Sequence, residues 1–298
     1  KIKSIIACYI NLPFNIVKKV KFYRFRVNYI KINSERVTNA SQISEYETVV
    51  VGGDQLWNTR ITKKNKLFFL ENCKCKNKIA FSVSMGYTDR TEEEKKFYEK
   101  YINNFDNIYI REKYDVNYIN TIWNKKDCEY VLDPTLLIDK NTWIKCCGDR
   151  IIKCKYVLVY SFNDDENIIQ TAKKISIEKG LPIYIINSSF KKKNKYGFIN
   201  LRGIGPKDFI TLIRDAEYII TNSFHGTVFS IIFNKKFKCV PYLGTEGRMI
   251  SLLSILNLET TLKDIDFNID YDKVSDILEN EKIKARKITQ IFLKENKE

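Results

Sequence analysis

Short runs of β-branched and aromatic residues alternate with helical segments along most of this chain, and this alternation limits its fold more than any other feature. In the first half, each strand-like run ends close to Gly, Arg or Asp, where a loop is expected to begin. These runs are residues 48–51, 78–84, 107–110 and 129–132. Between them, Thr91 and Glu94 form a capping box that opens a predicted helix. Such alternation is typical of α/β folds with parallel sheets.

A second series of the same kind begins at residue 156. Its strand-like runs are residues 156–161, 183–186, 218–221 and 237–240, and its helical segments are residues 165–179, 206–216, 226–233 and 273–294. The Lys-rich stretch 145–155 interrupts the pattern, and we interpret it as the connection between two domains. The sequence therefore predicts one domain over residues 1–148 and another over 149–298, each binding ligands beyond the carboxyl ends of its strands.

The chain is strongly basic, with 51 Lys and Arg against 36 Asp and Glu and a net charge of +15. Such a charge predicts an anionic partner, which at this point is a nucleic acid, an anionic membrane face, an acidic glycan or a phosphorylated small molecule. Because the whole chain is rich in Lys, Ile and Asn, solvated Lys without a function explains part of the excess positive charge. Because no helix-turn-helix, P-loop or aromatic RNA-binding motif is present, we expect no nucleic-acid partner.

The cysteines and the hydropathy pattern concern the cellular compartment. Eight Cys without a C-x-x-C pair, together with a single His, argue against a zinc site and fit reduced thiols in the cytoplasm. No apolar run reaches the roughly 18 residues that a membrane span needs. We therefore expect a cytoplasmic protein that is soluble or peripheral to the membrane. The basic, aromatic segment 14–29 fits a helix packed on the first domain, which we favour, or a helix lying on an anionic leaflet.

The segment 221–227, Thr-Asn-Ser-Phe-His-Gly-Thr, joins a predicted buried strand to a predicted buried helix. The first N–H groups and the dipole of a helix attract anions, and Ser223 or Thr227 adds a hydroxyl. His225 is the only imidazole of the chain and suits a general acid, a general base or a phosphate ligand near neutral pH. The alternative is that Asn222 and Ser223 only cap the helix and that His225 is structural. We favour the functional interpretation.

The segment 52–58, Gly-Gly-Asp-Gln-Leu-Trp-Asn, places a carboxylate, two amides and an indole directly after a predicted strand. Asp54 suits a base toward a hydroxyl, and Trp57 suits stacking on a sugar ring. A turn begun by Asp54, with Trp57 buried in the core, fits the same pattern equally well.

Two arginines are further candidates for anion binding. Arg111 follows a predicted strand, and its fork of donors matches phosphate or carboxylate, although a surface pair with Glu112 is the simpler interpretation. Arg248 precedes a predicted helix over residues 250–256 and is an anion ligand or an ordinary flanking charge.

Taken together, these segments resemble the polysaccharide pyruvyl transferase family. The resemblance covers most of the chain, and its most specific part runs from Gly205 to Thr227. The other matching motifs, in the order of the family, are residues 52–58, 82–86, 111–113 and 133–137, and Arg248 with Leu252 and Leu253.

The resemblance implies a fold similar to GT-B glycosyltransferases, with two Rossmann-like domains facing across a cleft, the first on the acceptor side and the second on the donor side. It implies phosphoenolpyruvate as a co-substrate. We expect no other cofactor and assign no metal-binding residue, and the sequence leaves any metal requirement open. Members transfer pyruvate as a ketal onto two hydroxyls of a sugar in a capsule, exopolysaccharide or cell-wall glycan and release phosphate. The expected acceptor is therefore a glycan or a lipid-linked glycan.

Roles for individual residues follow from the same resemblance. The expected catalytic residues are His225, Asp54 and Glu112. The expected donor-binding residues are Asn222, Ser223, Phe224, Gly226, Thr227, Arg111 and Arg248, and the expected acceptor-binding residues are Gln55, Trp57 and Asn58. Ser223 stands where some members have an Arg, two residues before the His.

One departure from the family and two alternative functions complete the expectations. Family members begin with a strand, a loop with Gly and Asn, and a helix, which this sequence lacks before its basic segment 18–31. We therefore expect a first domain without its N-terminal strand. A glycosyltransferase with a nucleotide-sugar donor and a non-catalytic protein of glycan assembly are the alternatives, because one fold serves many functions. The sequence leaves the oligomeric state open.

Overall fold

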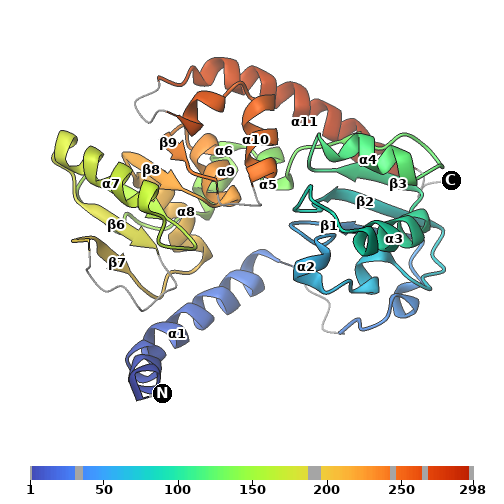
Figure 1. Ribbon diagram of the computed structural model, residues 1–298, viewed down its shortest axis with the longest axis horizontal. Helices are drawn as coiled ribbons and strands as arrows, with labels where there is room; N and C mark the ends of the chain where they lie inside the picture. Colours follow the sequence, from blue (N-terminus) through green and yellow to red (C-terminus); the bar gives the residue numbers. More distant parts are fainter. Residues whose placement is uncertain (1, 31–35, 187–195, 242–245, 264–267, 295–298) are drawn as a thin grey trace. The chain divides into compact units, whose positions relative to one another are not determined.

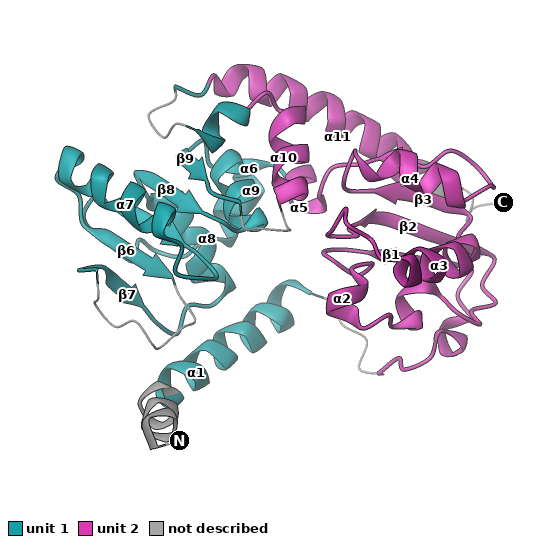
Figure 2. Cartoon of the chain, in the orientation of Figure 1, with its two compact units in different colours: residues 1–33, 138–242, 259–269 teal, residues 34–137, 243–258, 270–298 magenta. Residues whose placement is uncertain are grey.

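The computed structural model describes residues 2–30, 36–186, 196–241, 246–263 and 268–294. Its contacts divide the chain into two compact units, which Figure 2 distinguishes by colour. Unit 1 contains residues 1–33, 138–242 and 259–269, and unit 2 contains residues 34–137, 243–258 and 270–298. Within the described ranges, no helix has the length and apolarity to cross a membrane.

Unit 2 is built on a four-stranded parallel sheet in the order β1-β2-β3-β4 (Figure 1). The strands are β1 (Thr48–Gly52), β2 (Asn77–Val83), β3 (Asn107–Ile110) and β4 (Glu129–Tyr130). The α-helices are α2 (Thr59–Thr62), α3 (Glu92–Tyr101), α4 (Asp115–Ile122), α5 (Pro134–Leu137), α10 (Glu246–Ile255) and α11 (Tyr271–Lys294). Three short 3₁₀ helices are η1 (Ala40–Ile43), η2 (Lys66–Phe69) and η3 (Ile102–Asn104).

Both faces of the unit 2 sheet are covered, as the alternation of side chains along β3 requires. Ile108 and Ile110 belong to the main core cluster, with α3 and α4. Tyr109 belongs to a second buried cluster, in which Ala285 and Ile288 of α11 take part. A strand buried on both faces needs apolar residues at consecutive positions. This requirement explains the continuous apolar runs in the sequence.

Unit 1 contains a five-stranded parallel sheet in the order β7-β6-β5-β8-β9. The strands are β5 (Val157–Tyr160), β6 (Ile183–Ile186), β7 (Ile199–Leu201), β8 (Tyr218–Thr221) and β9 (Lys236–Cys239). The helices are α1 (Ile2–Tyr29), α6 (Lys140–Cys146), α7 (Glu166–Lys179), α8 (Pro206–Asp215), α9 (Phe224–Ile232) and the 3₁₀ helix η5 (Glu259–Leu262). From β5 the chain builds outward to β7 and then resumes on the other side at β8. The direction therefore reverses between β5 and β8, and such switch points form ligand sites in open α/β sheets.

The division into units differs from the predicted boundary at residue 148. The Lys-rich stretch 145–155, expected to connect two domains, lies inside unit 1, where Gly148 N–H donates to Thr211 Oγ1 of α8 at 2.8 Å. The C-terminal helix α11 packs in unit 2, although the sequence predicted it with the second domain. Contacts between residues far apart in sequence decide these memberships, and periodicity in a single segment carries no information about them.

Helix α1 also differs from its expectation. The favoured interpretation placed the segment 14–29 on the first domain, but α1 belongs to unit 1 and contacts α8. Lys21 Nζ forms an ion pair with Asp208 Oδ2 at 2.7 Å. Strand β7 was not predicted, because its three residues are too short to show a period.

Candidate functional site

The first cluster of predicted site residues lies at the switch point of unit 1. Asn222, directly after β8, is buried, and its amide joins the ends of two strands. Its Oδ1 accepts from Phe162 N–H at 3.1 Å, and its Nδ2 donates to Ser161 Oγ at 3.0 Å and to Asn163 Oδ1 at 2.6 Å. Asn222 therefore fixes the loop after β5 against the start of α9.

The start of α9 is held tightly against β8. Ser223 is the N-cap, and its Oγ accepts from Gly226 N–H at 3.3 Å. Thr227 Oγ1 donates to Ser223 O at 3.2 Å. A Cβ atom at Gly226 would lie 2.4 Å from Thr221 Oγ1, so this close approach needs glycine.

His225 lies in the first turn of this helix and is only partly buried, whereas the predicted donor residues around it are buried. The ring of Phe224 lies edge-on to the imidazole, with a centroid distance of 5.5 Å. The N-terminal end of a helix carries a positive partial charge, which stabilises an anion beside it. Of the residues of this segment, His225 is the most exposed.

A cavity of about 500 Å³ opens next to this segment, at the carboxyl ends of the strands β5, β6 and β7. Ser161, the partner of Asn222, lines it, together with side chains of α1 and of the loop before α8. Its two charged lining residues, Lys18 and Arg202, are both basic. The cavity has the volume of a small-molecule site and a charge that suits an anion.

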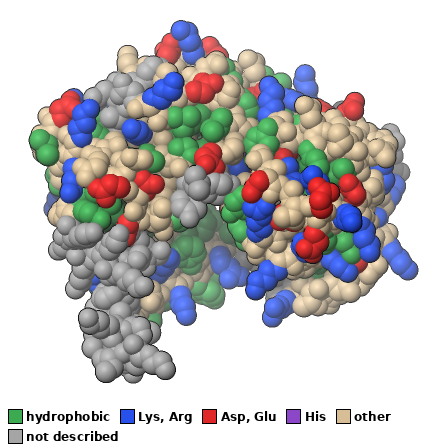
Figure 3. Space-filling view, in the orientation of Figure 1, with side chains coloured by type: hydrophobic (Ala, Val, Ile, Leu, Met, Phe, Trp, Pro, Cys, Tyr) green, Lys and Arg blue, Asp and Glu red, His purple; other side chains and the backbone are tan. Residues whose placement is uncertain are grey.

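The net charge of the chain is confined to unit 1. This unit contains 27 basic and 12 acidic residues, whereas unit 2 contains 24 of each. On the face drawn in Figure 3, acidic side chains lie among the basic ones over unit 2. The anionic partner that the sequence predicts is therefore expected to bind unit 1.

The second cluster of predicted site residues surrounds Arg111, at the end of β3 in unit 2. Arg111 is 4% exposed and contacts three carboxylates. Its Nη1 donates to Asp133 Oδ2 at 2.7 Å, its Nη2 to Asp54 Oδ1 at 3.0 Å and its Nε to Glu112 Oε1 at 3.3 Å. Burial lowers the pKa of Arg111, but Glu112, Asp133 and Asp54 outweigh burial and raise it. In this structure each nitrogen of the guanidinium binds a protein carboxylate, so Arg111 is held by unit 2 itself and its expected role as a phosphate ligand stays a prediction.

Asp54 is the member of this cluster that reaches the surface, with its side chain 55% exposed. Besides Arg111, Arg248 Nη1 approaches its Oδ1 at 3.8 Å. Burial, and then the like charge of Arg111, lower the pKa of Arg248. Asp54 is therefore positioned by two buried cations while one side of its carboxylate faces solvent.

Glu112, expected as a base, has a different position. It is 1% exposed, and Met85 N–H donates to its Oε2 at 3.4 Å while Arg111 binds its Oε1. A carboxylate with both oxygens bonded inside the protein does not reach a substrate. In this structure Glu112 positions Arg111. From the sequence, Asp133 was interpreted only as the residue that follows a strand. In the structure it holds Arg111 in place together with Glu112, a role that residue spacing did not indicate.

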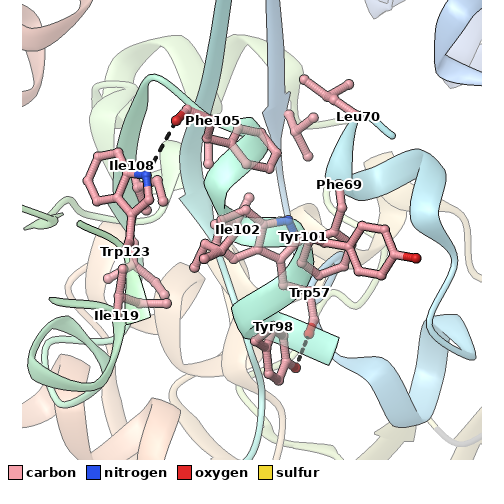
Figure 4. Close-up of a cluster of buried hydrophobic side chains, with 14 of the residues drawn as sticks. Trp57, Phe69, Leu70, Tyr98, Tyr101, Ile102, Phe105, Ile108, Ile119 and Trp123 are labelled. Atoms are coloured by element: carbon pink, nitrogen blue, oxygen red, sulfur yellow. Dashed lines mark hydrogen bonds between the residues drawn. The ribbon is translucent and has the colours of Figure 1, made fainter. Parts of the chain in front are cut away.

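Trp57 corrects the expectation of a stacking platform for a sugar. Its side chain is fully buried, and its Nε1 donates to Phe68 O at 2.9 Å. Its ring stacks on Phe69 at a centroid distance of 5.3 Å and meets Phe105 edge-on at 5.1 Å. Figure 4 shows it inside the aromatic cluster, with the hydroxyl of Tyr98 bound to its backbone oxygen. The alternative interpretation, Trp57 as a core residue, describes the structure.

Asn58 and Gln55, the other expected acceptor residues, lie beside this core. Asn58 is 1% exposed and caps α2 through its Oδ1, which accepts from Arg60 N–H at 3.1 Å. Its Nδ2 donates to Gln55 Oε1 at 2.8 Å. Asn58 therefore has a structural role. Gln55 is only partly buried, so its side chain is the one of the two that solvent reaches.

The expected site residues therefore form two clusters. Unit 1 holds His225 with Asn222, Ser223, Phe224, Gly226 and Thr227, and unit 2 holds Asp54 with Glu112, Arg111, Arg248, Gln55, Trp57 and Asn58. Sequence reasoning missed the buried ion pair of Arg90 with Asp115 at the start of α4. Burial raises the pKa of Asp115 to about 7 against the opposing effect of Arg90. Among the described residues, no group of His, Cys, Asp and Glu is arranged to hold a metal ion.

The two parallel sheets confirm the predicted α/β fold with two Rossmann-like domains, and solved structures resemble it. UDP-GlcNAc 2-epimerase from Neisseria meningitidis, bound to UDP-GlcNAc, aligns with a TM-score of 0.50 and 8% identity over 89% of this chain and 84% of that chain. UDP-GlcNAc 2-epimerase from Methanocaldococcus jannaschii aligns with a TM-score of 0.47 and 13% identity, over 89% of this chain and 73% of that chain. The wall teichoic acid polymerase TagF aligns with a TM-score of 0.45 and 10% identity, over 100% of this chain and 98% of that chain. At these identities the likeness concerns the fold, which is of the GT-B type.

No curated protein matches the sequence. The family model "Polysaccharide pyruvyl transferase" matches residues 2–244. This range covers most of the 298 residues and contains both the segment 52–58 and the segment 221–227. The chain therefore belongs to the polysaccharide pyruvyl transferase family.

Proposed function

We propose that the protein transfers the pyruvyl group of phosphoenolpyruvate, as a ketal, onto two hydroxyls of a sugar in a cell-surface polysaccharide or its lipid-linked precursor. The observation that carries the proposal is the place of His225. It lies in the first turn of α9, at the switch point of the sheet, on the unit that contains the whole excess of positive charge. Family membership supplies the reaction class.

The donor is a compact trianion, so its site must stabilise phosphate and carboxylate together. The N-terminal end of α9 and the imidazole of His225 suit the phosphate. Lys18 and Arg202 line the adjoining cavity and suit a second anionic group. Since Arg111 already binds three carboxylates, we assign this role to the cations of unit 1 instead.

An addition at C2 of the donor and then a substitution at the same carbon complete the reaction. In the first, C3 takes a proton, C2 becomes cationic, and a sugar hydroxyl bonds to C2 and loses its proton to a base. In the second, another hydroxyl of the same sugar bonds to C2, its proton is removed, and the C2–O bond to phosphate breaks. We assign to His225 the protonation of C3 or the stabilisation of the departing phosphate. We assign to Asp54, the half-exposed carboxylate held by Arg111, the removal of a hydroxyl proton.

The test measures phosphate release from phosphoenolpyruvate with a panel of free and lipid-linked β-glycosides, and the mass of the acceptor afterwards. We expect release that requires an acceptor, that adds one pyruvyl ketal, and that is lost in His225→Ala. Lys174→Ala, an exposed change on α7 of the same unit, is the matched control and should retain activity. Thermal stabilisation by a nucleotide sugar but not by phosphoenolpyruvate, with no phosphate released by any acceptor, would overturn the proposal.

A further inference from the structure

Helix α1 packs on unit 1 with one face only. Lys21, on this face, pairs with Asp208 at the start of α8. The side chain of Val17 lies beside Gly203, where an added Cβ atom would meet its Cγ1 at 3.4 Å. The Lys21 side chain similarly approaches Gly205. Residues at intervals of three or four share a face of a helix, so Val17 and Lys21 mark the inner face of α1.

The face of α1 away from Lys21 is apolar and exposed, and Phe14 (39% exposed) and Phe22 (43%) add exposed apolar surface elsewhere on the helix. The side chains of this face follow a spacing of three or four residues and, at about 100° per residue, lie about 100° to 180° around the helix from Lys21. They are Leu12 (48% exposed), Ile16 (53%), Val20 (43%), Tyr23 (67%), Val27 (63%) and, just beyond the helix, Ile30 (47%). We call these six residues the outer face. An apolar stripe of this length, about 27 Å at 1.5 Å per residue, is unusual on a water-exposed helix and indicates a docking surface.

The charges beside the outer face have one sign. Lys19, Arg24 and Arg26 are exposed at its flanks. Residues 1–33 contain eight basic residues and no acidic residue. They account for a large part of the net charge of +15 that unit 1 carries. The surface that covers this helix must therefore combine an apolar layer with negative charge.

We propose that α1 docks unit 1 on an anionic lipid bilayer, with the helix lying in the plane of the interface. The outer face would enter the boundary between head groups and acyl chains, where Tyr is favoured, and the flanking Lys and Arg would reach the lipid phosphates. A second copy is a poorer partner, because two such helices would bring basic side chains together without a carboxylate between them. A membrane-spanning role does not apply, since no described helix is apolar enough.

Vesicle flotation of the full chain tests this proposal with three variants. The first variant, Lys19→Gln/Arg24→Gln/Arg26→Gln, removes the flanking charges. The second variant, Tyr23→Ser/Val27→Ser, removes the two most exposed apolar side chains of the outer face. The matched control Lys140→Gln/Lys153→Gln/Lys174→Gln removes the same charge from exposed positions elsewhere in unit 1. The vesicles are phosphatidylcholine alone or phosphatidylcholine with phosphatidylglycerol.

We expect binding to the anionic vesicles only, weakened by salt. The flanking-charge variant should lower the partition coefficient about 100-fold, since each basic side chain at an anionic surface contributes roughly a fivefold factor. The control should change it little, because charges farther from the bilayer than a Debye length of about 10 Å are screened. Tyr23→Ser/Val27→Ser should weaken binding while the melting temperature stays unchanged. Equal binding to neutral vesicles, absence of binding, or a lipid-free dimer that this last variant dissociates would each overturn the proposal.

Discussion

Replacing Arg111 by Met should destabilise unit 2 severely, because the side chain holds carboxylates that have no access to water. Glu112 is 1% exposed and Asp133 is 4% exposed. Without Arg111, both remain buried without their cation, and breaking a buried ion pair from one side costs about 3–5 kcal/mol. The whole stability of a domain is about 5–15 kcal/mol. The variant should therefore lose about a fifth or more of the free energy of unfolding.

The pH dependence of this loss gives a sharper test. A buried carboxylate without a cation has a raised pKa, so the folded variant binds more protons than its unfolded chain. Its stability then rises as the pH falls, and the difference from the natural protein should shrink from pH 7 toward the normal carboxylate pKa of about 4. Adding Asp133→Asn, which keeps the oxygen that accepts from Thr135 N–H, should restore part of the loss at pH 7.

Urea unfolding can follow unit 2 separately. In a Trp143→Phe background the two remaining tryptophans, Trp57 and Trp123, both lie in the core of unit 2, so their fluorescence reports on that unit. An Arg111→Met variant with the same free energy of unfolding as the Trp143→Phe background protein would contradict this prediction. A difference between the two proteins that grows as the pH falls would contradict it equally.

Three further predictions concern particular contacts. Burial opposes the ionisation of Glu94, but hydrogen bonds from Arg60 and neighbouring donors outweigh burial and lower the pKa of Glu94 to about 2. Glu94→Gln should therefore reduce the free energy of unfolding by about 2 kcal/mol at pH 7, a value discounted for the solvent exposure of Arg60. A carboxylate with a lowered pKa contributes its full stability only above the pKa of the unfolded chain and loses it as the pH falls toward the folded pKa, so urea titrations should show more than half of that cost gone by about pH 3. Trp57→Ala should cost about 3–5 kcal/mol by urea unfolding, with the acceptor KM of the folded fraction unchanged. Gly226→Ala should displace α9 from Thr221 and, in steady-state kinetics, lower kcat/KM for phosphoenolpyruvate by about 100-fold, with circular dichroism confirming the fold.

Much of the fold was predictable from local pattern, since each strand inside a parallel sheet must be apolar on both faces. The strands over 107–110, 183–186 and 218–221 occur at the bounds that the sequence predicts. Asp165 caps α7, and Gly180 ends it in the left-handed conformation with a φ of 63°. Membership of the two units was not predictable, because α1 and α11 join their sheets through contacts with residues far away in sequence.

The positions of the candidate residues in the fold were predictable, but their exposure was not. Residues after a parallel strand lie at the ligand edge of the sheet, so position alone made Asp54, Arg111 and His225 candidates. Their exposure depends on neighbours that the pattern does not reveal. Asp133 and Glu112 bind Arg111 inside the protein, and an aromatic cluster encloses Trp57. Residue type indicates what a side chain is able to do, and burial decides whether it meets a substrate.

The uneven charge of the two units bears on how the proposed reaction divides its substrates. Unit 1 combines a net positive charge with a helix N-terminus and the single His, which together favour the anionic donor and its departing phosphate. Unit 2 is neutral and presents a carboxylate held by buried arginines, which suits a neutral sugar hydroxyl that must lose a proton. Removing the exposed carboxylate alone, in Asp54→Asn, should therefore lower kcat with acceptor while binding of phosphoenolpyruvate, measured by calorimetry, stays unchanged. A weakened affinity for phosphoenolpyruvate in that variant would place the donor on unit 2 and reverse the assignment of the two units.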